Sequence, residues 1–409
     1  MARSSRRPCT YYEYLKFIVD KHQNINPLYN KLLKHTQSEG YSLPEISFVR
    51  TKDGYKLRLH RINSQTGLNL PKLKKKKPKF KGVVFMQHGL MCSSADWLVP
   101  GGLAYTLANS GYDVWMGNFR GNLYSYTHKE LEQEDSEFWN FSWDEHGTID
   151  LPTMIDHVLD VTNADQLTFI GHSMGTTAFF VMMNAYPEMN KKIKYAVALA
   201  PVTHVPNMHG IPRKTIYSIS WAIWALKLVK LYNFFKYKKF MANAGIMCAI
   251  MYPAGYHSID FDRTFRILGT APAGTSIHNL SHYIQNFYKG KFHSRDGKTT
   301  YELSKVTCPI TLWYTKADWA AGEKDTGLIL SALGSEVKEV KEVILDNFGH
   351  LDFLWDLRAQ NVLYNQIARD LDKIHCEITT NLKPILGTLG PNFDPFGPNL
   401  ETIIKALLI

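Results

Sequence analysis

The middle of the chain alternates between continuous apolar runs and segments with helical periodicity. Strands that are buried on both faces of a parallel sheet read as unbroken apolar runs. Helical patterns cover Trp97 to Ala108 and Ile149 to Val161, and a third follows Ser173. The apolar runs are Gly82 to Gln87, Asp113 to Met116, Leu167 to Ile170 and Tyr195 to Ala200. This succession of βα units predicts an α/β fold with a mostly parallel sheet and right-handed crossovers.

A different pattern precedes these units. The segments Ile46 to Arg50 and Tyr55 to Ile62 partly alternate apolar and polar residues, and Asp53 and Gly54 stand between them. Alternating segments around an Asp-Gly turn are typical of an antiparallel hairpin. We therefore expect a β-hairpin before the first buried strand.

The strand pattern stops at about His204 and resumes after about Lys305. Two further strands are predicted at Ile310 to Tyr314 and Glu342 to Leu345, and a helix from roughly Trp355 to Ile374 would close the domain. An insertion between strands of a parallel sheet would lie over their carboxyl ends, as a cap or lid. The expected organisation is an N-terminal extension (1–43), a first core part (44–203), the cap (204–305), a second core part (306–377) and a C-terminal tail (378–409).

One face of a helix in the insertion is apolar and aromatic. The residues on it are Trp221, Trp224, Leu228, Leu231 and Phe235. Packing of this face onto the core is the first interpretation, and a lid or lipid-contacting surface is the second.

Composition and charge narrow the possible partners. The chain has 409 residues, 45% of them hydrophobic, and a formal net charge of +10. The charges are dispersed and no recognition helix or stacking motif is present, which argues against nucleic acid. The dense basic run from Lys72 to Lys77 is predicted to be a solvated loop, with a membrane-surface contact as the alternative. No cofactor or metal motif is found, and the oligomeric state is left open.

No transmembrane segment is expected. The longest uncharged apolar stretch, Phe240 to Tyr256, is shorter than a membrane span and contains Pro253. Near the N-terminus, Lys16 and Asp20 confine the apolar piece to three residues, too few for a secretory signal, whereas an Arg- and Ser-rich transit peptide remains an alternative. The localisation is therefore left open.

Five cysteines lie far apart and are predicted to be structural thiols: Cys9, Cys92, Cys248, Cys308 and Cys376. Two Asn-x-Ser sequons, at Asn140 and Asn279, matter only if the chain enters the secretory pathway.

The residues with the clearest chemistry stand between a predicted strand and a predicted helix, at Gly171 to Gly175 (GHSMG). A serine in such a turn adopts a strained backbone, and glycines two positions to either side leave room for the packing. We therefore take Ser173 as the candidate nucleophile.

A serine nucleophile needs a base that a carboxylate orients. The loops after the two later strands offer Asp318 as the carboxylate and His350 as the base. Asp325 lies in the next predicted helix and Asp352 lies beyond the histidine, which makes both poorer candidates. For each residue a structural role alone is the alternative.

The oxyanion of a tetrahedral intermediate requires two backbone N–H donors. Met174 follows the nucleophile and supplies one. The loop after Gln87 supplies the other, from Leu90 or, as the next choice, Met91. His88 would be an alternative base, but it precedes the nucleophile in chain order.

A series of motifs in order resembles the acid lipase family of α/β-hydrolases, which includes gastric and lysosomal acid lipases and insect lipases. The resemblance covers roughly Gly40 to Ile374. Its motifs are DGYKLRLHRI (53–62), MQHGLMCSSADW (86–97), GYDVWMGNFRGN (111–122), SEFWNFSWDEHGTIDLPTMID (136–156), GHSMGTT (171–177), PAGTS (272–276) and FGHLDFLWD (348–356).

The resemblance implies an α/β-hydrolase fold and hydrolysis of neutral lipid esters at a lipid–water interface, without a metal or cofactor. It places the same roles on Ser173, Asp318, His350, Leu90 and Met174. Relatives usually carry Gln where Met174 stands, and Cys248 is the only cysteine in the cap, so the family's cap disulfide is absent. The resemblance also implies a secreted or lysosomal protein.

Three hypotheses remain at this point. The first is a lipase for triacylglycerols and similar neutral lipids. The second is a steryl ester hydrolase or carboxylesterase with another acyl or alcohol preference. The third is a lipid-binding protein that keeps the fold without catalysis.

Overall fold

The computed structural model describes residues 36, 39, 41, 44–63, 79–204, 206–208, 213–228, 267 and 270–375. The contacts divide the chain into two units, residues 1–364 and residues 365–409, and each is described by itself. In the second unit, residues 365–375 are helical. Everything that follows concerns the first unit.

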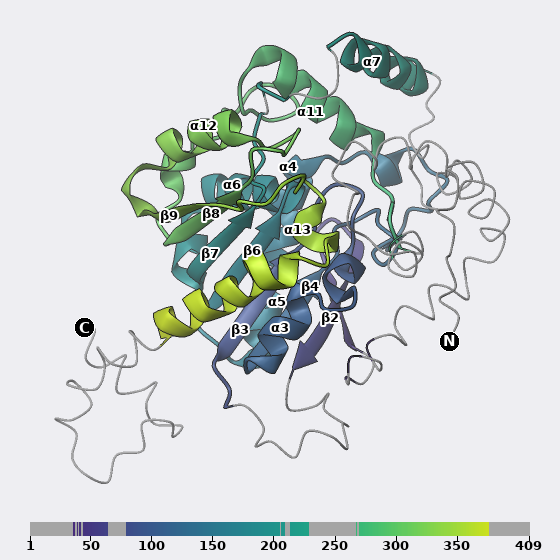
Figure 1. Cartoon of the computed structure of the whole chain (residues 1–409). Helices are drawn as coiled ribbons and strands as arrows, with labels where there is room; N and C mark the ends of the chain where they lie inside the picture. The colour runs from purple at the N-terminus through teal and green to yellow at the C-terminus, as the bar shows by residue number, and fades with distance from the viewer. Residues whose placement is uncertain are drawn as a thin grey trace, which may run out of the picture. The chain divides into compact units, whose positions relative to one another are not determined.

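A mixed sheet forms the centre of the unit, with the order β1-β2-β4-β3-β6-β7-β8-β9 and with β5 paired to β2 (Figure 1). β1, β2 and β4 pair antiparallel, and β4 through β9 are parallel along this path. The strands are β1 (Glu45–Arg50), β2 (Tyr55–Asn63), β3 (Gly82–Gln87), β4 (Tyr112–Gly117), β5 (Thr127–His128), β6 (Leu167–His172), β7 (Ile193–Leu199), β8 (Ile310–Tyr314) and β9 (Val337–Glu342). The predicted hairpin and α/β sheet are confirmed.

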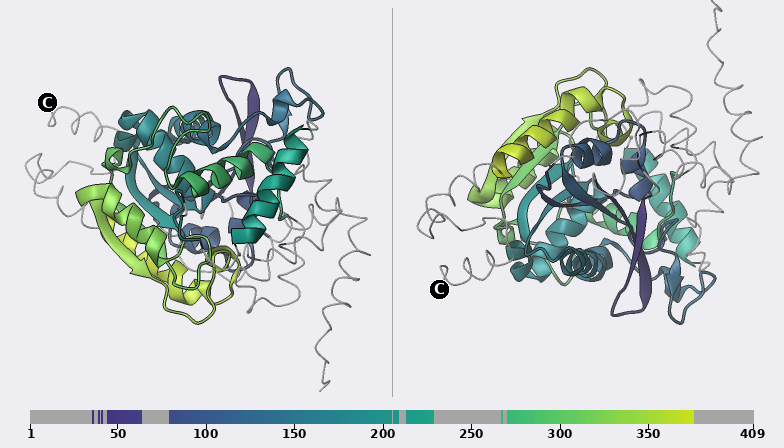
Figure 2. Two further views of the ribbon diagram at one scale, coloured as in Figure 1. Left: turned by 90° about the horizontal axis from the view of Figure 1, so that it is seen from above. Right: turned by 90° about the horizontal axis from the view of Figure 1, so that it is seen from below.

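Helices cover both faces of the sheet. Figure 2 shows α3 on one face and α5 and α6 on the other. The α-helices in the described part of the unit are α3 (Leu103–Asn109), α4 (Trp143–Glu145), α5 (Leu151–Thr162), α6 (Met174–Ala185), α7 (Arg213–Leu228), α11 (Ile277–Lys289), α12 (Glu323–Leu333) and α13 (Asp352–Trp355). Because β3, β4 and β6 are covered on both sides, their residues are almost all buried, as their apolar sequences predict.

The main core lies between the sheet and the α5–α6 layer. Phe85 and Phe169 of the sheet stack at 6.3 Å between ring centroids, and Phe169 stacks on Phe179 of α6 at 4.6 Å. Met154, Val158 and further residues of α5 join the same cluster. This packing fixes β6 and α6, and so the turn between them.

Three predicted element boundaries are wrong. The helix expected from Trp97 begins at Leu103 instead, because the chain turns at Gly101 (φ +69°) and a Cβ at Gly102 would lie 2.4 Å from the Trp97 carbonyl oxygen. The strand expected at Glu342–Leu345 is β9, Val337–Glu342. It is an edge strand in which four of the six residues are charged (VKEVKE), so no continuous apolar run marks it.

The third boundary is the helix expected from Trp355. α13 ends at Trp355, and the next helical residue is 359. The side chain of Asp356 binds the Arg358 backbone N–H at 2.6 Å and holds the intervening turn.

Between β7 and β8, the described residues include α7 and α11 and no strand of the sheet. Tyr283 of α11 hydrogen-bonds Thr177 on the first turn of α6 at 2.8 Å, so α11 lies over the carboxyl end of β6. Other predictions lie outside the described residues: the run Lys72–Lys77, the residues Leu231 and Phe235, and most of the two termini.

Candidate active site

Ser173 occupies a strained turn between β6 and α6. Its backbone has φ 53° and ψ −119°, a combination that non-glycine residues rarely adopt, and its N–H donates to the Leu199 carbonyl at 3.1 Å. A Cβ at Gly171 would lie 2.8 Å from the Phe169 ring, and one at Gly175 would lie 2.4 Å from the Gln87 carbonyl oxygen. Only glycine fits at these two positions, as the motif predicts.

The structure brings Ser173, His350 and Asp318 into one hydrogen-bonded line. His350 Nε2 lies 2.7 Å from Ser173 Oγ, and His350 Nδ1 lies 2.7 Å from Asp318 Oδ2. Because a carboxylate can only accept, Nδ1 carries the proton and Nε2 is left to accept from the serine hydroxyl. Ser173 retains 9% of its exposure, and Asp318 retains none.

Asp318 is buried and still ionised. Burial alone would raise its pKa, but His350 and the backbone N–H groups of Ala320 and Ala321, at 2.8 and 2.9 Å, outweigh this effect and lower the pKa. One carboxylate oxygen is thus fixed by the main chain, and the other faces the imidazole.

The two alternative carboxyls are engaged elsewhere. Asp325 accepts from the backbone and side-chain nitrogens of Asn207, at 3.2 and 3.0 Å. Asp352 accepts from the Gly349 N–H at 2.6 Å, and its burial raises its pKa to about 8. Neither has a recorded contact with the His350 ring.

His88, the alternative base, is turned away from the serine. Its Nδ1 lies 2.8 Å from the Gly89 carbonyl, to which it donates, and its Nε2 accepts from the Phe119 N–H and the Asn122 amide, each at 3.1 Å. Burial lowers its pKa to about 3, so the ring is neutral.

The loop that carries Leu90 lies against the nucleophile. A Cβ at Gly89 would be 3.0 Å from Ser173 Cβ, and the Gly89 carbonyl accepts from the Cys92 N–H at 3.2 Å, closing a turn around Leu90 and Met91. Within the described residues, no acceptor is recorded for the N–H of Leu90 or Met174.

Comparison with known proteins identifies the family of this chain. A family model described as "alpha/beta hydrolase fold" matches residues 82–357, more than half of the chain, and one described as "Partial alpha/beta-hydrolase lipase region" matches residues 34–101. Human gastric triacylglycerol lipase is 34% identical over 367 residues, which cover 80% of this chain and 87% of that protein. The chain belongs to the acid lipase family.

Other members of the acid lipase family match at similar levels. Lipase 1 of Drosophila melanogaster is 34% identical over 81% of this chain and 77% of its own length. Human lysosomal acid lipase/cholesteryl ester hydrolase is 32% identical over 80% of this chain and 86% of its own length. Among solved structures, an esterase from Exiguobacterium antarcticum matches with a TM-score of 0.51 at 12% identity over 80% of this chain and 99% of its own, a likeness in fold.

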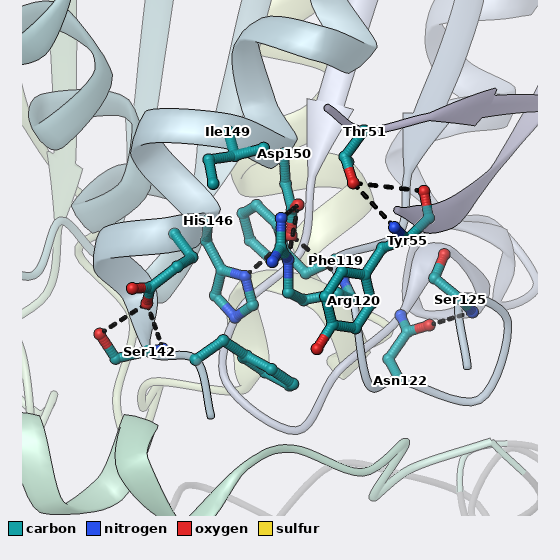
Figure 3. Close-up of polar contacts among 12 residues, drawn as sticks. Thr51, Tyr55, Phe119, Arg120, Asn122, Ser125, Ser142, His146, Ile149 and Asp150 are labelled. Carbon is teal, nitrogen blue, oxygen red and sulfur yellow. Dashed lines mark hydrogen bonds and ion pairs between the residues drawn. The ribbon is translucent and has the colours of Figure 1, made fainter. Parts of the chain in front are cut away.

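A buried charge network beside the site was not predicted from the sequence (Figure 3). Arg120, 2% exposed, pairs with Asp150 at 2.6 Å and with Asp53 at 2.5 Å, and its guanidinium lies 4.1 Å from the centre of the Tyr55 ring. His146 contacts Asp150 at 3.1 Å. Burial alone would raise the pKa of Asp150, but Arg120 and His146 outweigh it and lower the pKa.

This network supports the loop around Leu90 through the residues next to Arg120. Phe119 and Asn122 donate to His88, which in turn donates to Gly89. The sequence gives little indication of this network, because the partners of Arg120 lie far away along the chain.

The apolar face of α7 is not packed onto the core, so the first interpretation of this face is wrong for the described residues. Trp221, Trp224 and Leu228 are 69%, 58% and 68% exposed, whereas Ile223 is buried. Between α7 and α11 is a hollow of about 330 Å³, lined by Ser220, Ile223, Trp224, Lys227, Leu228, Ser281 and Ile284.

The remaining predictions are simpler to place. Cys92 and Cys308 are both buried. Asn140 is exposed, but Asn279 is fully buried and its amide lies 3.0 Å from His146 Nε2, so a folded chain has no room for a glycan there. Within the described residues, no helix has the length and apolar character needed to cross a membrane.

Proposed function

We propose that this acid lipase family member hydrolyses carboxylic esters of neutral lipids, such as triacylglycerols, with Ser173 as the nucleophile. The observation that carries the proposal is the line of two 2.7 Å contacts that runs from Ser173 through His350 to Asp318. The three residues follow β6, β8 and β9 of the parallel part of the sheet, and the lipase relatives favour the same chemistry.

In the first step, Ser173 Oγ attacks the ester carbonyl carbon while His350 Nε2 takes the hydroxyl proton. Asp318 stabilises the imidazolium that forms. The N–H groups of Leu90 and Met174 donate to the oxyanion of the tetrahedral intermediate. When the intermediate collapses, the C–O bond to the alcohol breaks and His350 gives its proton to the departing alcohol oxygen.

In the second step, water attacks the acyl-enzyme. His350 takes a proton from this water, and the second tetrahedral intermediate forms on the same two N–H donors. When it collapses, the bond to Ser173 Oγ breaks and His350 gives the proton to this oxygen. The products are the fatty acid and the regenerated serine. Only side chains and backbone groups of the chain take part, so the proposal needs no metal or cofactor.

We place a cap at residues 204–305. Within this cap, we propose that the exposed face of α7 contacts the lipid–water interface. Trp221, Trp224 and Leu228 expose an apolar, aromatic surface, and such residues favour the boundary between water and acyl chains. The hollow between α7 and α11 continues this apolar surface.

A steryl ester hydrolase is the second candidate. It is favoured by the relative named lysosomal acid lipase/cholesteryl ester hydrolase, at 32% identity. The triad chemistry is the same in both cases, and only the alcohol that leaves differs.

The test compares the wild type with Ser173→Ala on a short-chain soluble ester, triolein and cholesteryl oleate. The wild type is expected to hydrolyse the lipid esters, with higher activity above their solubility limit, and Ser173→Ala is expected to lose activity on all three. Preference for cholesteryl oleate supports the second candidate. Full activity of Ser173→Ala, or none in the wild type, contradicts the proposal, and the latter result supports a lipid-binding role.

A further inference from the structure

The imidazole of His172 lies between the two loops that flank the nucleophile. His172 is the last residue of β6, directly before Ser173, and its side chain is fully buried. Its Nε2 is 2.9 Å from the main-chain carbonyl oxygen of His350, and the two imidazole rings are 5.1 Å apart between centroids. On its other side, a Cβ at Gly89 would lie 3.0 Å from His172 Nδ1.

These contacts determine the state of the ring. A carbonyl oxygen can only accept, so Nε2 carries the proton and donates to His350. His172 Nδ1 has no recorded hydrogen-bond partner in the described part of the chain. Burial, and secondarily repulsion by a charged His350, lower the pKa of His172 to about 3. The ring therefore stays neutral and does not compete with His350 for the serine proton.

We propose that His172 is a positioning residue, which holds the main chain of His350 at the distance from Ser173 that proton transfer requires. The inference rests on the proposed roles of Ser173 and His350. Asp318 orients the imidazole of His350 through Nδ1, but it does not fix the distance between the main chain of His350 and the end of β6. The His172 hydrogen bond fixes that distance, because it connects the His350 carbonyl to the residue that adjoins the nucleophile.

Loss of this donor has a specific consequence. The His350 carbonyl would lose its recorded side-chain partner, and the loop would shift while Ser173 and Asp318 keep their own supports, the Leu199 carbonyl and the Ala320 and Ala321 N–H groups. A displacement of about 1 Å in a reacting group lowers a rate by up to about 100-fold. Proton transfer from Ser173 should slow while the fold persists.

The experiment measures phosphonylation of Ser173 with a nitrophenyl phosphonate, a soluble probe that releases one nitrophenolate for each labelled site. The final amplitude counts the folded sites, and the rate constant reports how reactive each site is. His172→Phe keeps an apolar ring and removes the donor. His172→Gln carries an amide nitrogen at about the reach of Nε2, and His172→Asn carries the same amide too short to reach.

We expect the phenylalanine and asparagine variants to label at least about tenfold more slowly per site than the wild type. The glutamine variant should recover most of the rate. Should the phenylalanine variant not fold, the glutamine and asparagine pair decides the question, because both place the same polar group in the same cavity. Equal rates for that pair, or a wild-type rate in the asparagine variant, would overturn the inference.

His293→Phe is the matched control. His293 is also buried, donates from one ring nitrogen to a main-chain carbonyl, that of Ser294 at 2.7 Å, and has no recorded partner for the other in the described residues. The His293→Phe substitution should change the labelling amplitude or the stability of the fold, but not the rate constant of labelling per site. If the wild type itself does not react, the proposed function fails; if it reacts and the variants do not differ from it, only the role of His172 fails.

Discussion

In the proposed triad, the carboxylate of Asp318 orients His350, the proposed base. It is fully buried and accepts three hydrogen bonds, two from the main chain and one from His350. These bonds keep it ionised in a place where burial alone would favour the neutral acid. An amide in its place would present an N–H to His350 and select the wrong tautomer.

Asp318→Asn should therefore lower kcat for ester hydrolysis by on the order of 10⁴-fold with a native-like fold. Steady-state kinetics on a soluble nitrophenyl ester measure the effect. The control is Asp325→Asn, since Asp325 is also buried but binds Asn207. A loss below tenfold in Asp318→Asn, or an equal loss in the control, would contradict the role given to Asp318.

The contacts of Arg120 could not be predicted from the sequence, in contrast to those of the proposed triad. Ser173, Asp318 and His350, the proposed nucleophile, carboxylate and base, each follow a strand, and this placement can be predicted from the sequence. The partners of Arg120, by contrast, are Asp53 and Asp150, which only the folded chain brings together. Nor does any motif indicate that His88 and His172 are buried and neutral, because their burial depends on long-range packing.

At the scale of elements, the Arg120 network joins the β1–β2 turn, the loop after β4 and the start of α5. Arg120→Met would leave two carboxylates without their cation, one of them fully buried. We expect a loss of about 3–5 kcal/mol in the free energy of unfolding, measured by urea denaturation. Lys192→Met removes the more exposed pair with Asp156 and should cost less than about 1 kcal/mol. Similar losses for the two variants would argue against the network.

A separate prediction concerns the exposed face of α7 and its adsorption to lipid. Trp221→Ser combined with Trp224→Ser should weaken adsorption to a triolein emulsion by at least about tenfold, since each tryptophan buries a large apolar surface at an interface. Hydrolysis of a soluble short-chain ester should not change. The control is Leu328→Ser combined with Leu330→Ser on α12, since these two leucines are 41% and 40% exposed. Unchanged adsorption in the tryptophan variant would exclude this face as the contact.

Elements were predictable where their burial is uniform. β3, β4, β6 and β7 are apolar because neighbours cover both faces, and each was predicted within about two residues. β9 has one strand neighbour and carries charges, so its sequence resembles a loop. α3 begins late because backbone contacts around Gly102 end the earlier turn, and periodicity contains no information on such contacts.

For the whole molecule, buried titratable groups predict how stability depends on pH. A histidine whose pKa is lowered on folding stays neutral in the native state and binds a proton when unfolded, so it removes stability as the pH falls below about 6.5. A carboxyl whose pKa is raised removes stability as the pH rises from about 4 toward its folded pKa. The histidines with the most strongly lowered pKa are His60, His88, His172 and His282, at about 3, and His278, at about 4, and the pKa values of His146, His157 and His204 are lowered as well. The carboxyls with a raised pKa are Asp96 and Asp144, at about 6, and Asp352, at about 8.

The histidines with a lowered pKa outnumber the three carboxyls with a raised pKa, whereas Asp150 and Asp318, whose pKa values are lowered, reduce stability only below about pH 4. The thermal unfolding midpoint should therefore fall as the pH is lowered from about 6.5 to about 4.5. Differential scanning calorimetry across this range tests the prediction. A midpoint that rises toward acid would mean that the buried carboxyls dominate.

The proposed function is tested most directly by identifying the residue that a fluorophosphonate modifies. The wild type is labelled, digested and mapped by mass spectrometry, with lipid-ester hydrolysis followed in the same sample. If Ser173 is the nucleophile, we expect one adduct, on Ser173, which forms at the same rate as hydrolysis is lost. Hydrolysis that persists in fully labelled protein, or an adduct on another residue that accompanies its loss, would contradict the assignment of Ser173 as the nucleophile.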